Sequence, residues 1–247
     1  MQRIFMDFPV PDDGIVVGGE DAYHLLRVLR MKPGAEFIIT DPDGRDHCCV
    51  ITGVEADRLL ASKKSTRNNL SEPPYRVTLY QGMPKGDKTD TIVQKAVELG
   101  AAQIVFVVTE RSVSRPDEQS AAKKTVRLSR IAAGAAAQCG RAGIPSVRFL
   151  PDFTSALVEA VSADLPLFCY EGGGTPLPDL LGSVNEGCFA QNLNLSVLIG
   201  PEGGFSEREA REAEDAGCRF CTLGPRILRT ETAGIHVLSC LSYQFEK

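Results

Sequence analysis

The chain has 247 residues, of which 43% are hydrophobic and 24% are charged, a composition typical of a globular protein that dissolves in water. No apolar run approaches the roughly 20 residues needed to cross a bilayer, and the first residues lack the basic segment and apolar core of a secretory signal. We therefore expect a cytoplasmic protein with no membrane partner, and the net charge of −5 argues against a nucleic-acid partner for the chain as a whole.

The first 70 residues predict short strands separated by turns. Apolar runs at 14–19 and 35–65 are rich in strand formers, and DPDGRD within the second run has the turn chemistry of a β-hairpin. A helical segment at 19–30 interrupts the strands. We expect a small β-barrel domain over residues 1–70, joined to the rest by a linker at 67–75 that contains two prolines.

From residue 75 onward the pattern changes to alternating strands and helices. Apolar strand segments lie at 76–83, 103–110, 166–171, 195–200 and 218–224. Helical segments lie at 86–100, 121–141, 154–164 and 206–217, and a last helix begins at about Ile227. Continuously apolar strands that alternate with helices predict a parallel sheet covered on both faces. We therefore expect an α/β domain over residues 75–247.

Positive charge is concentrated in the middle of the chain. Residues 71–150 carry twelve Lys and Arg against seven Asp and Glu, and no acidic residue lies within 119–151. Lys123, Arg127 and Arg130 have the spacing i, i+4, i+7 and share one face of the predicted helix. This face is either simply solvated or in contact with phosphates, and the absence of compensating acids leaves both interpretations open.

The chain has eight cysteines and three histidines, which raises the question of a metal site. Only Cys218 and Cys221 have CxxC spacing, and they lie in a predicted strand, where residues three apart point to opposite faces. A zinc site needs a second ligand pair, and none is near. We expect no metal site, and reduced cysteines that pack in the core.

A glycine-rich turn separates a strand from a helix within LSVLIGPEGGFSEREA (195–210). Glycines let a ligand approach the main chain, and Ser206 and Glu209 have the spacing of a capping box at a helix start. The turn lacks the glycine spacing of phosphate-binding loops, and Glu202 within it repels phosphate. Two further turns follow predicted strands, at 168–176 (FCYEGGGTP) and 222–234 (TLGPRILRTETAG). We expect the three loops to line one pocket; a tight connection without a ligand is the alternative.

These motifs resemble those of the small-subunit ribosomal RNA uridine-N3 methyltransferase family (RsmE-like) of the SPOUT superfamily. The pair GPEGG and LGPRILRTETA is specific. Further matching stretches are HLLRVLRMKPG near the start, MPKGDKTDTIVQKAVELGAAQIVFVVTERSV in the middle and QCGRAGIPSV after the long helix. The resemblance thus covers nearly the whole chain. One departure is Ala137, where the family usually has a Glu directly before Gln138; a role of this Glu in RNA binding or in the dimer contact does not carry over in full to this chain.

The resemblance implies a PUA-like, RNA-binding β-barrel followed by an α/β methyltransferase domain whose last helix is threaded into a deep trefoil knot. It implies S-adenosylmethionine as cofactor, a homodimer with each active site at the subunit interface, and a uridine of ribosomal RNA in a small-subunit particle as substrate. Two alternatives remain: a SPOUT ribose 2′-O RNA methyltransferase with the same cofactor pocket, and a non-catalytic RNA-binding or ribosome assembly factor that keeps the fold.

Methylation of uridine N3 requires that a proton leave, so the site needs a base or a group that stabilises the uracil anion. We expect Arg229 to stabilise the anion and Glu231 or Glu202 to accept the proton; an orienting contact with an arginine is the other role for Glu231. The residues expected to bind the cofactor are Tyr170, Glu171, Ile199, Gly200, Glu202, Gly203, Gly204, Leu223, Gly224, Ile227, Leu228, Thr232 and Ala233. The residues expected to bind RNA are Arg27, Arg30, Lys85, Lys123, Arg127, Arg141 and Arg226.

Overall fold

The computed structural model describes residues 1–185 and 193–246. The chain divides into two compact units, one formed by Met1–Glu72 with Ala136–Ile144 and the other by Pro73–Ala135 with Pro145–Lys247. Residues 136–144, which the sequence analysis places in the second domain, therefore pack with the first unit. Within the described residues, no helix combines the length and the apolar character that a membrane crossing requires.

The first unit contains a five-stranded sheet with the strand order β1-β3-β4-β5-β2. The strands are β1 (Gln2–Phe5), β2 (Ile15–Val17), β3 (Glu36–Thr40), β4 (Arg45–Glu55) and β5 (Arg58–Asn68). The predicted hairpin at 41–46 is confirmed, because β3 and β4 pair antiparallel across it. The Asp41 carboxylate accepts hydrogen bonds from the backbone N–H groups of Asp43 and Arg45, and this contact stabilises the turn.

One short helical segment packs against this sheet. It consists of α1 (Gly19–Tyr23) and a π-helical turn, η1 (His24–Val28), close to the helix expected at 19–30. Ala22 and Leu25 of this segment are buried against Phe37, Leu59 and other apolar residues of the sheet. The apolar side chains of these strands and of the helical segment thus form a separate hydrophobic core in the first unit.

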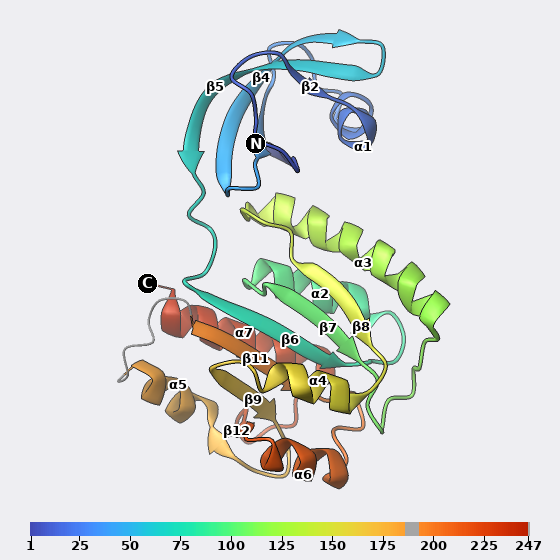
Figure 1. Cartoon of the computed structure of the whole chain (residues 1–247), viewed down its shortest axis with the longest axis vertical. Helices are drawn as coiled ribbons and strands as arrows, with labels where there is room; N and C mark the ends of the chain where they lie inside the picture. Colours follow the sequence, from blue (N-terminus) through green and yellow to red (C-terminus); the bar gives the residue numbers. More distant parts are fainter. Residues whose placement is uncertain (186–192, 247) are drawn as a thin grey trace. The chain divides into compact units, whose positions relative to one another are not determined.

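The second unit contains a seven-stranded sheet with the strand order β10-β12-β9-β11-β6-β7-β8 (Figure 1). The strands are β6 (Tyr75–Gly82), β7 (Gln103–Val107), β8 (Ser146–Leu150), β9 (Leu165–Cys169), β10 (Thr175–Pro176), β11 (Leu193–Ile199) and β12 (Arg219–Thr222). All neighbouring strands pair parallel, so the predicted parallel sheet is confirmed. The carboxyl ends of β9, β11 and β12 lie at the same edge, because these strands are adjacent and parallel.

Helices cover both faces of this sheet. They are α2 (Lys88–Glu98), α3 (Glu118–Cys139), α4 (Phe153–Ala160), α5 (Leu177–Asn185), α6 (Glu207–Asp215) and α7 (Thr230–Phe245). Tyr80 of β6 shares a buried cluster with residues of α4 and α6, whereas Leu79 and Gln81 lie next to Gly234 of α7. Since successive side chains of a strand point to opposite faces, α4 and α6 cover one face and α7 covers the other, where it packs against α2.

Three local features concern where helices and strands begin and which of them the sequence pattern predicts. Helix α7 begins at Thr230 instead of Ile227, because Arg229 is the N-cap residue and has extended backbone angles. Strand β8 and helix α5 were not predicted: Arg148 interrupts the apolar run of the strand, and α5 starts with Leu-Pro and contains Gly182. The predicted capping box of Ser206 and Glu209 is confirmed.

Candidate functional site

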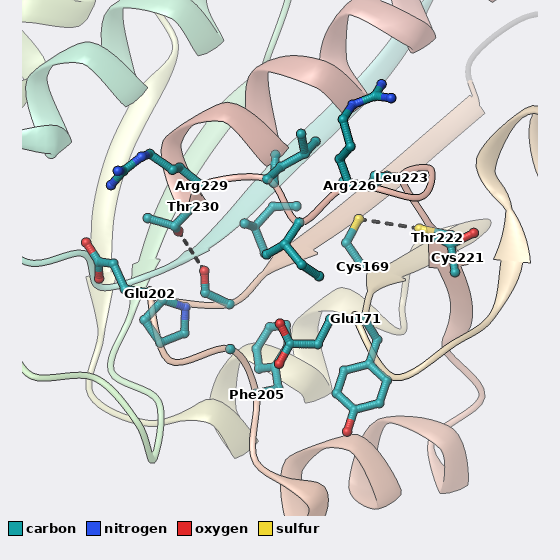
Figure 2. A pocket seen from close by; sticks show the side chains of 18 of the residues that line it. Cys169, Glu171, Glu202, Phe205, Cys221, Thr222, Leu223, Arg226, Arg229 and Thr230 are labelled. Atoms are coloured by element: carbon teal, nitrogen blue, oxygen red, sulfur yellow. Dashed lines mark hydrogen bonds between the residues drawn. The ribbon is translucent and has the colours of Figure 1, made fainter.

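A cavity of about 430 Å³ opens at the carboxyl ends of β9, β11 and β12. The three loops expected to form one pocket line it together: the loop after β9, the GPEGG turn after β11, and the loop between β12 and α7 (Figure 2). Ligand sites in parallel α/β sheets form in crevices outside the carboxyl ends of the strands. The cavity is within the size range of small-molecule sites.

Most residues expected to bind the cofactor line this cavity. They are Tyr170, Glu171, Ile199, Gly200, Glu202, Gly204, Leu223, Gly224, Ile227, Leu228 and Ala233. Gly203 and Thr232 are not among the lining residues, and neither is Glu231, whereas Arg226 and Arg229 are. The lining also contains residues that were not predicted from the sequence: Lys88, Cys169, Pro201, Phe205, Cys221, Thr222 and Thr230. Pro201 lies within the GPEGG motif and Thr230 within the RILRTETA motif. Membership in these motifs was the only sequence signal that could have placed the two residues in the site.

The glycines of the GPEGG turn permit close packing of the turn itself. A Cβ atom on Gly200 would lie 3.0 Å from the backbone carbon of Gly204, and Gly204 has a φ of +67°, a conformation that glycine adopts at little cost. A Cβ atom on Gly204 would also lie 2.9 Å from Oε1 of Glu171. Gly200 and Gly204 therefore let the turn fold back on itself beside the loop that follows β9.

Gly203 and Gly82 allow close contacts between the GPEGG turn and neighbouring segments outside the cavity. A Cβ atom on Gly203 would lie 3.2 Å from Cβ of Arg111, and the guanidinium of Arg111 donates to the Gly203 carbonyl at 3.0 Å. Gly82, at the end of β6, faces the nitrogen of Pro201, which a Cβ atom there would approach to 2.5 Å. The turn is thus packed from behind by β6 and by the loop that follows β7.

A lysine joins the GPEGG turn to the first turn of α7. Nζ of Lys88 lies 2.7 Å from Oε1 of Glu202 and 3.1 Å from Oε2 of Glu231, and the backbone N–H of Lys85 donates to the Glu202 carboxylate at 3.1 Å. Burial raises the pKa of Glu202, but the hydrogen bonds from Lys88 and Lys85 outweigh it, so the net pKa is lowered. The same hydrogen bond to Glu202 raises the pKa of Lys88.

This cluster bears on the two glutamates considered as proton acceptors. A carboxylate with a lowered pKa is a weak base, so Glu202 is suited to holding the turn in place and not to accepting a proton. The orienting partner expected for Glu231 is a lysine, Lys88, instead of an arginine.

Two cysteines form part of the cavity wall. Cys169 and Cys221 are paired in register on β9 and β12, and their Sγ atoms lie 3.4 Å apart (Figure 2). Contact with Cys221 and burial raise the pKa of the Cys169 thiol well above its usual value. The part of the chain that the structure describes contains no group of three or more His, Cys, Asp or Glu residues that could hold a metal ion.

Comparison with known proteins identifies the family. A family model for an RNA methyltransferase domain matches residues 71–242, and one for an RNA methyltransferase PUA domain matches residues 17–64. The ribosomal RNA small subunit methyltransferase E of Bacillus subtilis (strain 168) is 34% identical, over 93% of this chain and 90% of its own length. This chain belongs to the ribosomal RNA small subunit methyltransferase E family. The family and the two kinds of domain implied by the sequence motifs are thus confirmed.

Two other members extend the comparison. The methyltransferase E of Mycobacterium tuberculosis (strain CDC 1551 / Oshkosh) is 30% identical over 94% of this chain and 88% of its own length. The crystal structure of the methyltransferase E from Neisseria gonorrhoeae, bound to S-adenosyl methionine, aligns with a TM-score of 0.83 at 29% identity and covers 98% of this chain and 97% of that one. The fold of this chain is therefore that of the methyltransferase E family over nearly its full length.

The residues expected to bind RNA differ in their exposure. In the first unit, Arg27 and Arg30 are exposed, and Arg27 makes a long ion pair of 3.4 Å with Asp57. In the second unit, Lys123 and Arg127 are exposed on α3, as the helical spacing predicts, and the guanidinium of Arg127 pairs with the Asp90 carboxylate of α2 at 2.5 Å. Lys85 is exposed beside the GPEGG turn.

Arg141 requires a correction. Its side chain is only 7% exposed, and Nη2 lies 2.5 Å from the Glu72 carboxylate, which also accepts hydrogen bonds from the backbone N–H groups of Ala142 and Gly143. A buried arginine in such a pair is not available to a phosphate. Its role is to join the linker to the segment after α3, which sequence could not reveal because Glu72 and Arg141 are 69 positions apart.

Proposed function

We propose that this protein transfers the methyl group of S-adenosylmethionine to N3 of a specific uridine in small-subunit ribosomal RNA. The observation that carries the proposal is the cavity at the edge of the parallel sheet, lined by both family motifs, GPEGG and RILRTETA. The family of the chain, and the S-adenosyl methionine bound to its relative from N. gonorrhoeae, support the same cofactor and reaction.

The lining of the cavity fits S-adenosylmethionine. Apolar walls from Ile199, Leu223, Ile227 and Leu228 suit the adenine ring, and the backbone groups of the turns offer hydrogen bonds to its edge and to the ribose. The carboxylate of Glu171 in the wall favours a ligand with positive charge. Bound there, S-adenosylmethionine would supply an electrophilic methyl group on a sulfonium. The chain's own contribution is to hold the acceptor in line with that methyl group.

Arg229 is the residue that we propose to act on the acceptor. It lines the cavity and is exposed, and within the described residues no hydrogen bond or ion pair occupies its guanidinium. Figure 2 shows it on the same side of the cavity as Glu202 and Thr230, whereas Arg226 extends from the other end of the loop. A guanidinium beside a uracil carbonyl stabilises the negative charge that develops when N3 loses its proton to solvent water. Arg226 is then free to contact an RNA phosphate.

The RNA and the quaternary structure complete the proposal. We assign phosphate contacts to Arg27 and Arg30 in the PUA-like domain and to Lys85, Lys123 and Arg127 in the methyltransferase domain, all exposed cations. The proposal includes a trefoil knot at the last helix and a homodimer, both of which the resemblance of the motifs to the family supports. Ile227, 80% exposed beside the cavity, and Tyr243, 87% exposed on α7, offer apolar surface that a second subunit would cover. The expected place of action is a small-subunit particle in the cytoplasm.

The direct test is to locate the methyl group. Purified protein is incubated with isotopically labelled S-adenosylmethionine and small-subunit particles from a strain that lacks its gene, and the nucleosides of the digested RNA are analysed by mass spectrometry. We expect label in 3-methyluridine at one position. Label on a ribose 2′-oxygen would favour the alternative methyltransferase, and no label with a folded, cofactor-binding protein would favour an assembly factor.

The role of Arg229 has its own prediction. Replacing Arg229 with Ala should lower kcat by about 100-fold or more, as removal of one oxyanion donor does, while the affinity for S-adenosylhomocysteine stays nearly unchanged. Lys at this position keeps the charge but loses the planar fork, so partial activity is expected. A collapse of cofactor affinity with normal single-turnover rates at saturating cofactor would instead assign Arg229 to cofactor binding.

A further inference from the structure

A chain of buried hydrogen bonds connects the sheet, the GPEGG turn and the start of α7. Nε2 of Gln81 donates to Oγ1 of Thr230 at 2.7 Å, and this hydroxyl donates in turn to the carbonyl of Gly200 at 2.6 Å. Gln81 is fully buried and Thr230 is 5% exposed. We call these three residues the Thr230 network; the second of its bonds is drawn in Figure 2.

Each member of the Thr230 network belongs to a different element. Gln81 lies in β6, paired with Ile199 of β11, and Gly200 follows directly after β11. Thr230 is the first residue of α7. Because the Thr230 hydroxyl accepts one hydrogen bond and donates another, its side chain is fixed in one orientation. The first turn of α7 therefore has a defined position against the wall of the cavity.

The position of the first turn of α7 matters most for Arg229, the residue directly before Thr230. Arg229 is the N-cap of α7, and its carbonyl accepts from the backbone N–H groups of Thr232 and Ala233 at 2.9 Å. Within the described residues its side chain has no partner that would direct it. The backbone of the first turn thus determines where the guanidinium emerges, and the Thr230 side chain, hydrogen-bonded to Gln81 and to Gly200, determines the position of that backbone.

We propose that Thr230, held by Gln81, is a positioning residue for Arg229: it fixes the start of α7 relative to the GPEGG turn and so aligns the guanidinium with the acceptor base. Gln81 does not line the cavity; its amide nitrogen donates to Thr230 at 2.7 Å and, at the longer distance of 3.3 Å, to the carbonyl of Gly82 in its own strand. This inference rests on the proposed function, because it concerns the role that Arg229 has there.

The test compares three variants of the full-length protein. Thr230→Val keeps the side-chain shape but removes both hydrogen bonds, Gln81→Met removes the donor at similar volume, and Thr230→Ser keeps the hydroxyl. We expect the first two to lower kcat by about 10-fold or more, since displacement of a catalytic group by about 1 Å has effects of this size. Affinity for S-adenosylhomocysteine should change less than about 3-fold, a smaller effect than that on kcat, and Thr230→Ser should retain most of the activity.

A matched control separates positioning from loss of stability. Ser196 is buried in β11, and its hydroxyl donates to the carbonyl of Ala160 at 2.8 Å, a bond of the same kind away from the cavity. Ser196→Ala should lower the unfolding temperature as Thr230→Val does but leave kcat unchanged. Equal kcat values for the two variants would overturn the proposal.

A double-mutant cycle with Arg229→Ala provides the decisive readout. If Thr230 acts through Arg229, Thr230→Val should lower single-turnover rates by less than about 2-fold in the Arg229→Ala background. Independent, multiplicative losses would refute the positioning role, and so would a normal rate of the Arg229→Ala single variant. Failure of the proposed function has a different signature, because the wild-type protein would then form no 3-methyluridine.

Discussion

Replacement of Gly82 with Ala tests whether the GPEGG turn keeps its place by packing against β6. The added Cβ would lie 2.5 Å from the nitrogen of Pro201, 2.6 Å from its Cδ and 2.8 Å from the carbonyl carbon of Gly200. All three atoms belong to backbone or to the proline ring, so no flexible side chain can move aside. The turn itself has to move by about 1 Å to restore ordinary van der Waals distances.

The size of the effect follows from this displacement. Overpacking of this kind costs about 1–3 kcal/mol, which lowers the unfolding temperature of a protein of this size by about 2–4 °C per kcal/mol. The displaced segment contains Gly200, Pro201, Glu202 and Gly204, all of which line the cavity. We therefore expect the affinity for S-adenosylhomocysteine to fall by about 10-fold or more, equivalent to about 1.4 kcal/mol.

The assays are thermal unfolding and isothermal titration calorimetry with S-adenosylhomocysteine, and Gly134→Ala is the matched control. Gly134 lies in α3 with no heavy atom within 4 Å of an added Cβ, so Ala there should keep the affinity and raise stability by up to about 1 kcal/mol through its helix propensity. A Gly82→Ala protein with unchanged affinity and unfolding temperature would refute the argument that β6 holds the turn.

Two further predictions concern the RNA surface and the cavity cysteines. Lys123→Gln and Arg127→Gln should each weaken binding of small-subunit RNA and reduce the slope of log affinity against log salt by about one. Arg141→Gln is the control and should lower the unfolding temperature without changing that slope. Unchanged slopes for the Lys123 and Arg127 variants would show that α3 presents only a solvated face. Alkylation of Cys169 by iodoacetamide should be slow at neutral pH and accelerate as pH rises, because contact with Cys221 and burial raise the pKa of its thiol and the thiolate is the nucleophile. S-adenosylhomocysteine should slow the reaction, since Cys169 lines the cavity; equal rates with and without this ligand would contradict the assignment of the cavity.

The sequence by itself determined the order of elements and the location of the site. Apolar runs separated by helical segments predicted the parallel sheet, because strands buried on both faces need continuous apolar residues. Glycine-rich turns directly after three of these strands predicted the pocket, since such loops meet at one edge of a parallel sheet. The paired motifs indicated the family, and the Ser206 capping box indicated where α6 begins. All of these signals are local in the sequence.

Only the tertiary structure decided which side chains meet across the chain. Gln81 and Thr230 are 149 positions apart, and Lys88 and Glu202 are 114 positions apart, so no spacing rule connects them. The same holds for Arg141, whose position in a basic stretch predicted a phosphate contact but whose burial beside Glu72 excludes one. Gly203 lies in the glycine-rich turn and was therefore predicted to contact the cofactor. In the structure, a Cβ atom on Gly203 would instead point toward Arg111. Periodicity reports which residues share a face of one element, whereas the partner of a buried polar group depends on how elements pack together, and that packing is set by the whole chain at once.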